Sequence, residues 1–480
     1  MNDDISSLKK RTIWSVISLF LQSGYSAVLG LVANLVLTIL LSPTIFGIYI
    51  TVLSLISVLN YFSDIGLAAS LIQKKEITDE DVSTTFTVQQ ILIITLISLA
   101  FFATSSVQHF YQLPKEGVYL FWALLISFFI SSLKTIPSIF LERKIQFQKI
   151  VLVQMIENSV FYISTIILAV FHFGLLSFAI AVLLRAITGF VVIYSISFWL
   201  PTVGISMSSL KKLLSFGVPF QASSFLALFK DDLITLFLGK VLGFQGLGYI
   251  GWAKKWAEAP IRIIMDNISR VLFPVIARIQ GDKKKVASLV EKILLNQTLL
   301  LAPTMIVLVL IMPKLLDLIP KYNKWQPALP LFYLFCISAF LASYSTPFIN
   351  LFNAMGKVKI PLILMSFWTA ANWILTVYLT NLFGFYGFPI TQVILALTFV
   401  VVVYHAKKMI QINFLGSISK AIISAILTGL VMWALLTYLK TSFPTLSFTI
   451  LIGGISYLII LRSAFRFNLI KHFRELLFHG

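Results

Sequence analysis

The sequence predicts an all-α protein that crosses a membrane many times. Hydrophobic residues make up 59% of its 480 residues, charged residues make up 11%, and the mean hydropathy is +0.95. A soluble domain carries roughly 25% charged residues. Apolar runs of membrane-spanning length recur from one end of the chain to the other. In hydrocarbon such runs form helices, because no water is present to hydrogen-bond the backbone.

Fourteen apolar runs are long enough to cross the hydrocarbon core, which takes about 20 helical residues. They lie at 12–41, 44–71, 84–107, 117–140, 150–173, 174–197, 212–240, 244–277, 286–313, 326–352, 360–382, 385–406, 419–438 and 446–464. Turn residues such as Pro43 and Phe173-Gly174 join neighbouring runs into helical hairpins. The loops are too short for a soluble catalytic domain, which argues against an enzyme that needs one.

The Lys and Arg residues predict the orientation, because short cytoplasmic loops are enriched in them. The two termini and the loops after even-numbered runs, together with the adjoining run ends, hold 23 of these residues, whereas the opposite loops and run ends hold six. We therefore expect an inner-membrane or plasma-membrane protein with both termini in the cytoplasm. The formal net charge of +19 then reflects topology and attraction to anionic lipid, and we expect no nucleic-acid partner.

An internal repeat predicts two related lobes. At an offset of 210 residues, nine residues of segment 149–186 recur in segment 359–396, among them Phe173-Gly174 as Phe383-Gly384. The offset aligns the fifth and sixth runs with the eleventh and twelfth. Because the displacement is six runs, the lobes have the same orientation and are related by an axis along the membrane normal.

A weaker echo at an offset of 201 pairs the turn 41–47 with 242–248. We therefore predict two pseudo-twofold-related lobes of six helices, followed by two further helices. The N-terminal lobe takes residues 1–200 and the C-terminal lobe takes 201–410. Residues 411–480 form the two trailing helices and a cytoplasmic tail.

The sharpest charged feature is a ladder in the eighth run. It consists of Lys254, Glu258, Arg262, Asp266 and Arg270, at four-residue spacing with alternating sign, and of the adjacent Lys255. Residues four apart face each other on a helix, so each acid can bridge two bases. A charge at the bilayer centre costs roughly 2.5–3.5 kcal/mol on insertion scales, so the ladder must face protein or a water-filled cavity.

The ladder has a surplus of positive charge, which favours binding of an anionic group such as a phosphate. In this interpretation its four bases, Lys254, Lys255, Arg262 and Arg270, bind the anion, and Glu258 and Asp266 are their ion-pair partners. The alternative is a structural ladder that only holds the helix against its neighbours. Such a ladder would not need the surplus charge.

Further charges lie inside the apolar runs. Arg185, near the middle of the sixth run, either lines a cavity as a fifth anion-binding base or pairs with a buried acid such as Glu157. Asp231 and Asp232 are candidates for proton or sodium binding, the alternative being a structural pair with Lys230.

Asp64, Lys134 and Glu157 lie near predicted cytoplasmic ends, and we expect their side chains to reach the headgroups. The single cysteine, Cys336, excludes an intrachain disulfide and a cysteine-based metal cluster. No P-loop motif for ATP occurs. We predict no catalytic residue, no metal and no cofactor, and an ion or substrate gradient as the energy source.

Short segments spread from the first run to the eleventh carry a family resemblance. They are 41–47 (Leu-Ser-Pro-Thr-Ile-Phe-Gly), 64–67 leading into 71–75, 239–243 with 247–249, 270–274 leading to 279–280, Lys324-Trp325 and 354–357. On these segments the chain resembles the Wzx-type polysaccharide flippases of the multidrug/oligosaccharidyl-lipid/polysaccharide superfamily. The resemblance is to the branch that includes colanic-acid and teichuronic-acid exporters.

The resemblance implies fourteen helices and alternating-access transport of an undecaprenyl-diphosphate-linked oligosaccharide from the cytoplasmic to the outer leaflet. It implies as partners this lipid-linked substrate, membrane lipids and, in the same pathway, a polysaccharide polymerase and a chain-length regulator. The charged residues named above are an interpretation of this chain and are not carried over from the family.

Two alternatives stay open at the level of sequence. A drug or cation antiporter of the same superfamily would favour acids in its cavity. Among the charges considered for the membrane interior, the bases slightly exceed the acids, with bases at 134, 185, 230, 254, 255, 262 and 270 and acids at 64, 157, 231, 232, 258 and 266. A membrane-embedded polysaccharide polymerase would need a large external loop, which the predicted topology lacks.

Overall fold

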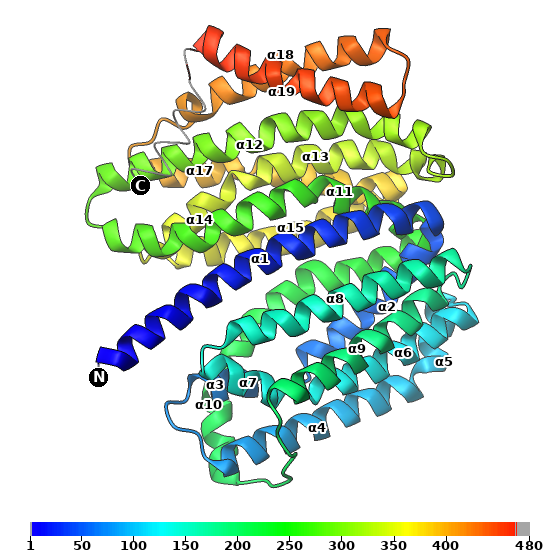
Figure 1. Cartoon of the computed structure of the whole chain (residues 1–480), viewed down its shortest axis with the longest axis vertical. Helices are drawn as coiled ribbons and strands as arrows, with labels where there is room; N and C mark the ends of the chain where they lie inside the picture. The colour runs from blue at the N-terminus through cyan, green and yellow to red at the C-terminus, as the bar shows by residue number, and fades with distance from the viewer. Residues whose placement is uncertain (1, 466, 468–480) are drawn as a thin grey trace. The chain divides into compact units, whose positions relative to one another are not determined.

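The computed structural model describes residues 2–465 and 467, and these residues form helices and turns without a strand. Side chains are described throughout this part except at 2–17, 19–21, 220, 222–227, 266–267 and 270–271. The chain divides into two compact units, Met1–Gly248 and Tyr249–Gly480. The helices of each unit are shown in Figure 1.

Unit 1 contains ten α-helices, a π-helical turn and the start of α11 among its described residues. They are α1 (Asn2–Leu40), α2 (Pro43–Tyr61), α3 (Leu67–Gln73), α4 (Asp79–Phe102), α5 (Thr104–Tyr111), α6 (Lys115–Ser132), α7 (Thr135–Arg143), α8 (Phe147–Val170), α9 (Leu176–Ile196), α10 (Met207–Ala227), η1 (Leu228–Asp232) and α11 (Leu233–Ile279). Its core packs α2, α6 and α9 together around fully buried side chains such as Val52, Leu120 and Ala181.

Unit 2 contains the rest of α11 and eight further α-helices among the described residues. They are α12 (Lys283–Leu318), η2 (Asn323–Ala328), α13 (Leu329–Ser343), α14 (Ser345–Ala354), α15 (Lys359–Phe383), η3 (Gly384–Tyr386), α16 (Gly387–Leu397), α17 (Phe399–Met409), α18 (Phe414–Tyr438) and α19 (Phe443–Phe465). One core of this unit packs α12, α14 and α17 around Leu294, Phe348 and Val402.

Helix starts follow from local capping. The Ser42 hydroxyl accepts the Ile45 N–H and Pro43 opens α2, while Thr78 and Asp81 form a capping box at the start of α4. The Asp282 carboxylate accepts the N–H groups of Lys284 and Lys285 at the start of α12.

The multi-span membrane architecture predicted from the sequence is confirmed. Twelve helical segments of the described chain are long and apolar enough to cross a membrane. The two longest, Leu228–Met265 and Lys359–Met409, are each interrupted by a glycine of positive φ, Gly243 at 68° and Gly384 at 57°. Division at these glycines is consistent with the predicted fourteen spans, and that number stays a prediction.

The turn of the 210-residue repeat is preserved in the structure. Helices α8 and α9 lie side by side and are joined through Gly174, whose φ is 55°. Helices α15 and α16 also pack together and are joined through Gly384, whose φ is 57°. Glycine adopts this left-handed conformation without steric cost, which explains its recurrence at this offset. The lobe boundaries at 200 and 410 stay a prediction, since the contact division falls at 248.

The 201-residue echo forms a reciprocal backbone contact. A Cβ placed on Gly47 would lie 1.7 Å from the Phe244 carbonyl oxygen, and one on Gly248 would lie 2.0 Å from the Pro43 carbonyl oxygen. The offset of 201 relates Pro43 to Phe244 and Gly47 to Gly248. The glycine of each turn therefore packs against the carbonyl group at the corresponding position of the other turn. Only glycine allows this close approach between backbones.

We expect the substitution Gly248→Ala to destabilise the protein by about 1–3 kcal/mol, because the added methyl group overlaps main-chain atoms of Pro43 that cannot rotate away. The measurement is the free energy of unfolding in detergent micelles.

Gly454→Ala is the matched control, because no atom lies within 4 Å of a Cβ at that position in α19. Its stability should be unchanged or slightly raised, since alanine favours helix more than glycine does. Equal stability of the Gly248→Ala protein and the parent would contradict the contact.

Candidate functional site

The structure shows part of the ladder predicted in the eighth run. Helix α11 carries it, and the Glu258 carboxylate bridges two bases, with Oε2 2.8 Å from Arg262 Nη2 and Oε1 3.9 Å from Lys254 Nζ. Lys254 Nζ also lies 5.9 Å from the centre of the Phe388 ring. The Arg262 side chain is 71% exposed, so one face of its guanidinium is free to meet a ligand.

Lys255 supplies the surplus charge of the ladder. It is exposed and forms no salt bridge within the part of the chain whose side chains are described. Asp266 and Arg270 lie within helix α11, but their side chains lie outside the described residues. Their predicted roles as ion-pair partner and anion-binding base therefore stay predictions.

Arg185 lies in unit 1, in the middle of α9. It is exposed, and its guanidinium carbon lies 5.8 Å from the centre of the Phe161 ring on α8. The phenol groups of Tyr49 and Tyr162 are within electrostatic range of it. Arg185 has no salt bridge among the described side chains, so of the two alternatives for this residue the structure favours an accessible cation.

Glu157, the acid considered as a partner for Arg185, pairs with Lys134 instead. The expectation that both side chains reach the headgroups is wrong, because they are only 8% and 16% exposed. Gly189 on α9 provides the space, since a Cβ there would lie 1.6 Å from Glu157 Oε1. A buried charge needs such a partner, and the pair joins α8 to the turn after α6.

Asp231 and Asp232 lie in η1, the π-helical turn that packs on α2. Asp231 is exposed, whereas Asp232 is half-buried. A π-helical turn in a membrane helix frequently marks a functional position. The sequence pattern did not predict this turn, because its single extra residue leaves no periodic signal.

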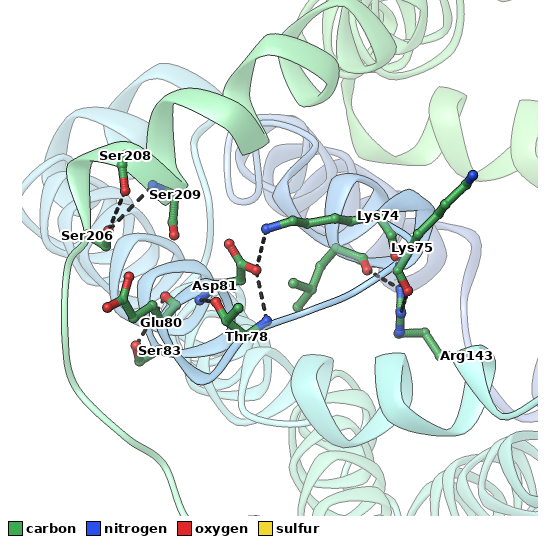
Figure 2. Close-up of polar contacts among 11 residues, drawn as sticks. Lys74, Lys75, Thr78, Glu80, Asp81, Ser83, Arg143, Ser206, Ser208 and Ser209 are labelled. Carbon is green, nitrogen blue, oxygen red and sulfur yellow. Dashed lines mark hydrogen bonds and ion pairs between the residues drawn. The ribbon is translucent and has the colours of Figure 1, made fainter.

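A polar cluster at one end of unit 1 was missed by the sequence analysis. Asp81 is fully buried, and Lys74 Nζ lies 2.5 Å from its Oδ2 (Figure 2). The same oxygen accepts the Thr78 N–H at 2.9 Å. This carboxylate fixes the loop between α3 and α4.

Arg143 holds the other side of that loop. Its guanidinium donates to the carbonyl oxygens of Leu71, Ile72, Lys74 and Lys75 at 2.5–3.0 Å. Figure 2 shows Arg143 beside Lys74 and Lys75. These carbonyl groups lie at the C-terminal end of α3, where a helix leaves such groups unpaired. The sequence places a basic residue, Arg143, at the end of α7. Its position alone does not predict these hydrogen bonds, because the carbonyl groups that accept them are about 70 residues away.

Asp64 caps α3 rather than reaching the headgroups, which corrects the expectation for this residue. Its two carboxylate oxygens accept the Ala68 N–H at 3.1 and 3.2 Å. Burial raises the pKa of this carboxyl group, and the N–H groups of Ala68 and Gly66 oppose the increase.

Comparison with known protein families shows the family to which the chain belongs. The profile of a family described as polysaccharide biosynthesis protein matches residues 36–330, which is more than half of the chain. The chain belongs to this family. The matched region includes Arg185, the described part of the α11 ladder and the Lys134–Glu157 pair. The predicted family resemblance is confirmed.

Two curated members of the polysaccharide biosynthesis class are similar over much of the chain. The lipopolysaccharide biosynthesis protein WzxC of Escherichia coli (strain K12) is 26% identical over 368 residues, 74% of this chain and 72% of that protein. The teichuronic acid biosynthesis protein TuaB of Bacillus subtilis (strain 168) is 25% identical over 307 residues, 62% of each chain.

The fold of this family member is that of a solved lipid transporter. The lipid II flippase MurJ, in an inward closed conformation, superposes with a TM-score of 0.75 and 15% identity. The alignment covers 95% of this chain and 99% of MurJ. At this level of identity the likeness establishes the fold, and the function has to be argued from the charges.

We expect Glu157→Gln to destabilise the protein by about 3–5 kcal/mol, because it leaves the buried Lys134 ammonium without its counter-charge. Chemical unfolding in detergent micelles measures this difference.

Glu258→Gln serves as the control, since it removes a carboxylate from a partly exposed ion pair and should cost at most about 1 kcal/mol. The double variant Lys134→Met, Glu157→Leu should recover most of the loss. Similar stability of the Glu157→Gln and Glu258→Gln proteins would contradict a structural role confined to the buried pair.

Proposed function

We propose that this protein is a flippase that moves an undecaprenyl-diphosphate-linked oligosaccharide from the cytoplasmic to the outer leaflet by alternating access. The observation that carries the proposal is the presence of accessible cations inside apolar membrane helices of a polysaccharide biosynthesis protein. Arg185 and Lys255 have no acidic partner among the described side chains, and Arg262 shares one. Such cations are costly in hydrocarbon unless an anion or water meets them.

A diphosphate headgroup requires cations of this kind. Transfer of an isolated anion into a medium of low dielectric constant costs tens of kcal/mol on Born estimates, so unaided flipping is negligible. Arginine is suited to the task because its planar guanidinium binds phosphate oxygens in pairs. Arg185 in unit 1 and Arg262 in unit 2 would each take part in the transfer.

The lipid tail needs an apolar surface, and unit 2 has one. A groove of about 650 Å³ lies among α12, α13 and α18. It is lined by residues such as Met305, Phe340 and Trp433, and no charged side chain contributes to it. An isoprenoid chain leaving the headgroup could remain in contact with this groove without entering water. The groove therefore supports a lipid substrate over a water-soluble one.

An ion gradient is the proposed energy source. Asp231 and Asp232 in η1 present two adjacent carboxyl groups inside a candidate span, and the π-helical turn alters their direction relative to α11. Proton or sodium binding at these residues would couple a gradient to transport. The structural alternative, in which they only pair with Lys230, predicts no ion dependence.

We propose the bacterial inner (plasma) membrane as the location, with both termini in the cytoplasm. The multi-span architecture and the distribution of Lys and Arg support this orientation. The further partners would be a polysaccharide polymerase and a chain-length regulator that use the flipped lipid. Transport without catalysis agrees with loops too short for a catalytic domain. A drug or cation antiporter is the second candidate, and the charge surplus argues against it.

We expect Arg185→Gln and Arg262→Gln each to slow flipping of a fluorescent undecaprenyl-diphosphate oligosaccharide in proteoliposomes by about 10- to 100-fold. Each substitution removes a charged hydrogen bond to the headgroup, which contributes about 1.5–3 kcal/mol.

Lys115→Gln is the matched control, because Lys115 is an exposed cation at the start of α6. Its rate should equal that of the parent protein. Unchanged flipping by the arginine variants, with the protein folded and inserted, would overturn the anion-binding role.

We expect Asp231→Asn, Asp232→Asn in combination to abolish the acceleration of flipping by an imposed proton or sodium gradient, because neither amide can be protonated or bind the cation electrostatically. The control is Asp317→Asn, at an exposed carboxylate near the end of α12. A gradient response that survives the double substitution would leave the two aspartates with a structural role only.

A further inference from the structure

A charged pocket lies in unit 2, and no residue of α11 lines it. It has a volume of about 260 Å³ and lies where α12 and α18 begin, beside the end of α19. This volume is slightly below the roughly 300–1,000 Å³ of pockets for drug-sized ligands, so it suits a small headgroup. The distribution of Lys and Arg assigns this end of the unit to the cytoplasm.

The polar part of the pocket is positively charged. Lys292 from α12 and Lys420 from α18 line it from opposite helices, together with the hydroxyl groups of Ser288 and Ser417. Both lysines are exposed, and neither forms a salt bridge among the described residues. Like charges at one pocket repel each other, and a bound anion removes that repulsion.

Glu291 is the one acid that lines the pocket, and it has another role. Its Oε1 accepts the backbone N–H of Asn413 at 2.6 Å, which connects α12 to the residue before α18. This hydrogen bond engages the carboxylate with the chain rather than with the lysines. The pocket therefore keeps a net positive charge.

The remaining lining is apolar and lies further along the membrane helices. Leu295 and Leu299 follow Lys292 by about one and two turns of α12, and Leu461 and Phe467 complete this part. Leu299 and Leu461 are only 3% and 1% exposed. Polar and cationic groups at the helix start, followed by apolar groups inside the span, match the sequence of groups in a phospholipid from headgroup to acyl chain.

We propose that this pocket binds the phosphate of an anionic phospholipid of the cytoplasmic leaflet through Lys292 and Lys420. The Ser288 hydroxyl group donates a further hydrogen bond to the phosphate, and the first acyl carbons contact Leu295 and Leu299. The Ser417 hydroxyl donates to the Asn413 carbonyl oxygen at 2.8 Å. Basic pockets between membrane helices on the cytoplasmic side are suited to such headgroups. The bound lipid bridges α12 and α18, and the proposal does not depend on the transported substrate.

The test is native mass spectrometry of the full-length protein titrated with phosphatidylglycerol, and in parallel with phosphatidylcholine. We expect one phosphatidylglycerol to bind more tightly than the rest. In the variant Lys292→Gln, Lys420→Gln its affinity should fall by about fivefold for each lysine lost. Phosphatidylcholine should show no such site.

A matched charge control is Lys357→Gln, Lys359→Gln, which removes two exposed lysines near the start of α15, outside the pocket. This variant should retain the tight phosphatidylglycerol. An equal loss in both variants would reduce the effect to general surface charge and overturn the proposal.

Two further experiments test the position of the bound lipid and the identity of the occupant. Phosphatidylglycerol with a diazirine near its headgroup should crosslink to peptides that contain Leu295, Leu299 or Leu461, and crosslinks elsewhere would contradict the pocket. Inorganic phosphate at millimolar concentration should not displace the lipid. Displacement would identify a free phosphate as the occupant and overturn the assignment to phospholipid.

Discussion

Charge cannot remain uncompensated in hydrocarbon, and this constraint organises the molecule. The structure meets it in two ways. Lys134 and Glu157 neutralise each other in the interior of unit 1, where Gly189 leaves room for the carboxylate. The side chains of Arg185, Lys255 and Arg262 remain accessible, and their positive charges have to be compensated by an external anion or by water. The first arrangement stabilises the fold, and we propose that the second binds the substrate.

The sequence predicted the features that depend on local spacing. The Glu258 ladder was predictable because residues four apart on a helix always face one another, and the turn at Gly174 was predictable from its recurrence at Gly384. Contacts between distant segments were not predictable in this way. Nothing near Glu157 in the sequence indicates that Lys134, 23 residues away, is its partner.

The polar cluster in Figure 2 also depends on contacts between residues far apart in the sequence. Arg143 pairs with carbonyl oxygens about 70 residues away, and Asp81 becomes buried only when α3, α4 and α10 pack together. The reciprocal contact of Gly47 and Gly248 could be predicted only in part from the sequence. The echo was visible in the sequence, but the close approach of the two backbones required the structure. Backbone contacts of this kind depend on few side chains, which is consistent with a fold shared at 15% identity.

We propose that the accessible cations bind a diphosphate. The most direct test compares two fluorescent lipids with the same isoprenoid tail and the same oligosaccharide, one joined through a diphosphate and one through a neutral ether. Both are reconstituted with the parent protein in vesicles, and the rate of appearance in the opposite leaflet is measured. We expect rapid transfer of the diphosphate lipid and only the protein-free rate for the neutral lipid. Equal rates for the two lipids would contradict it.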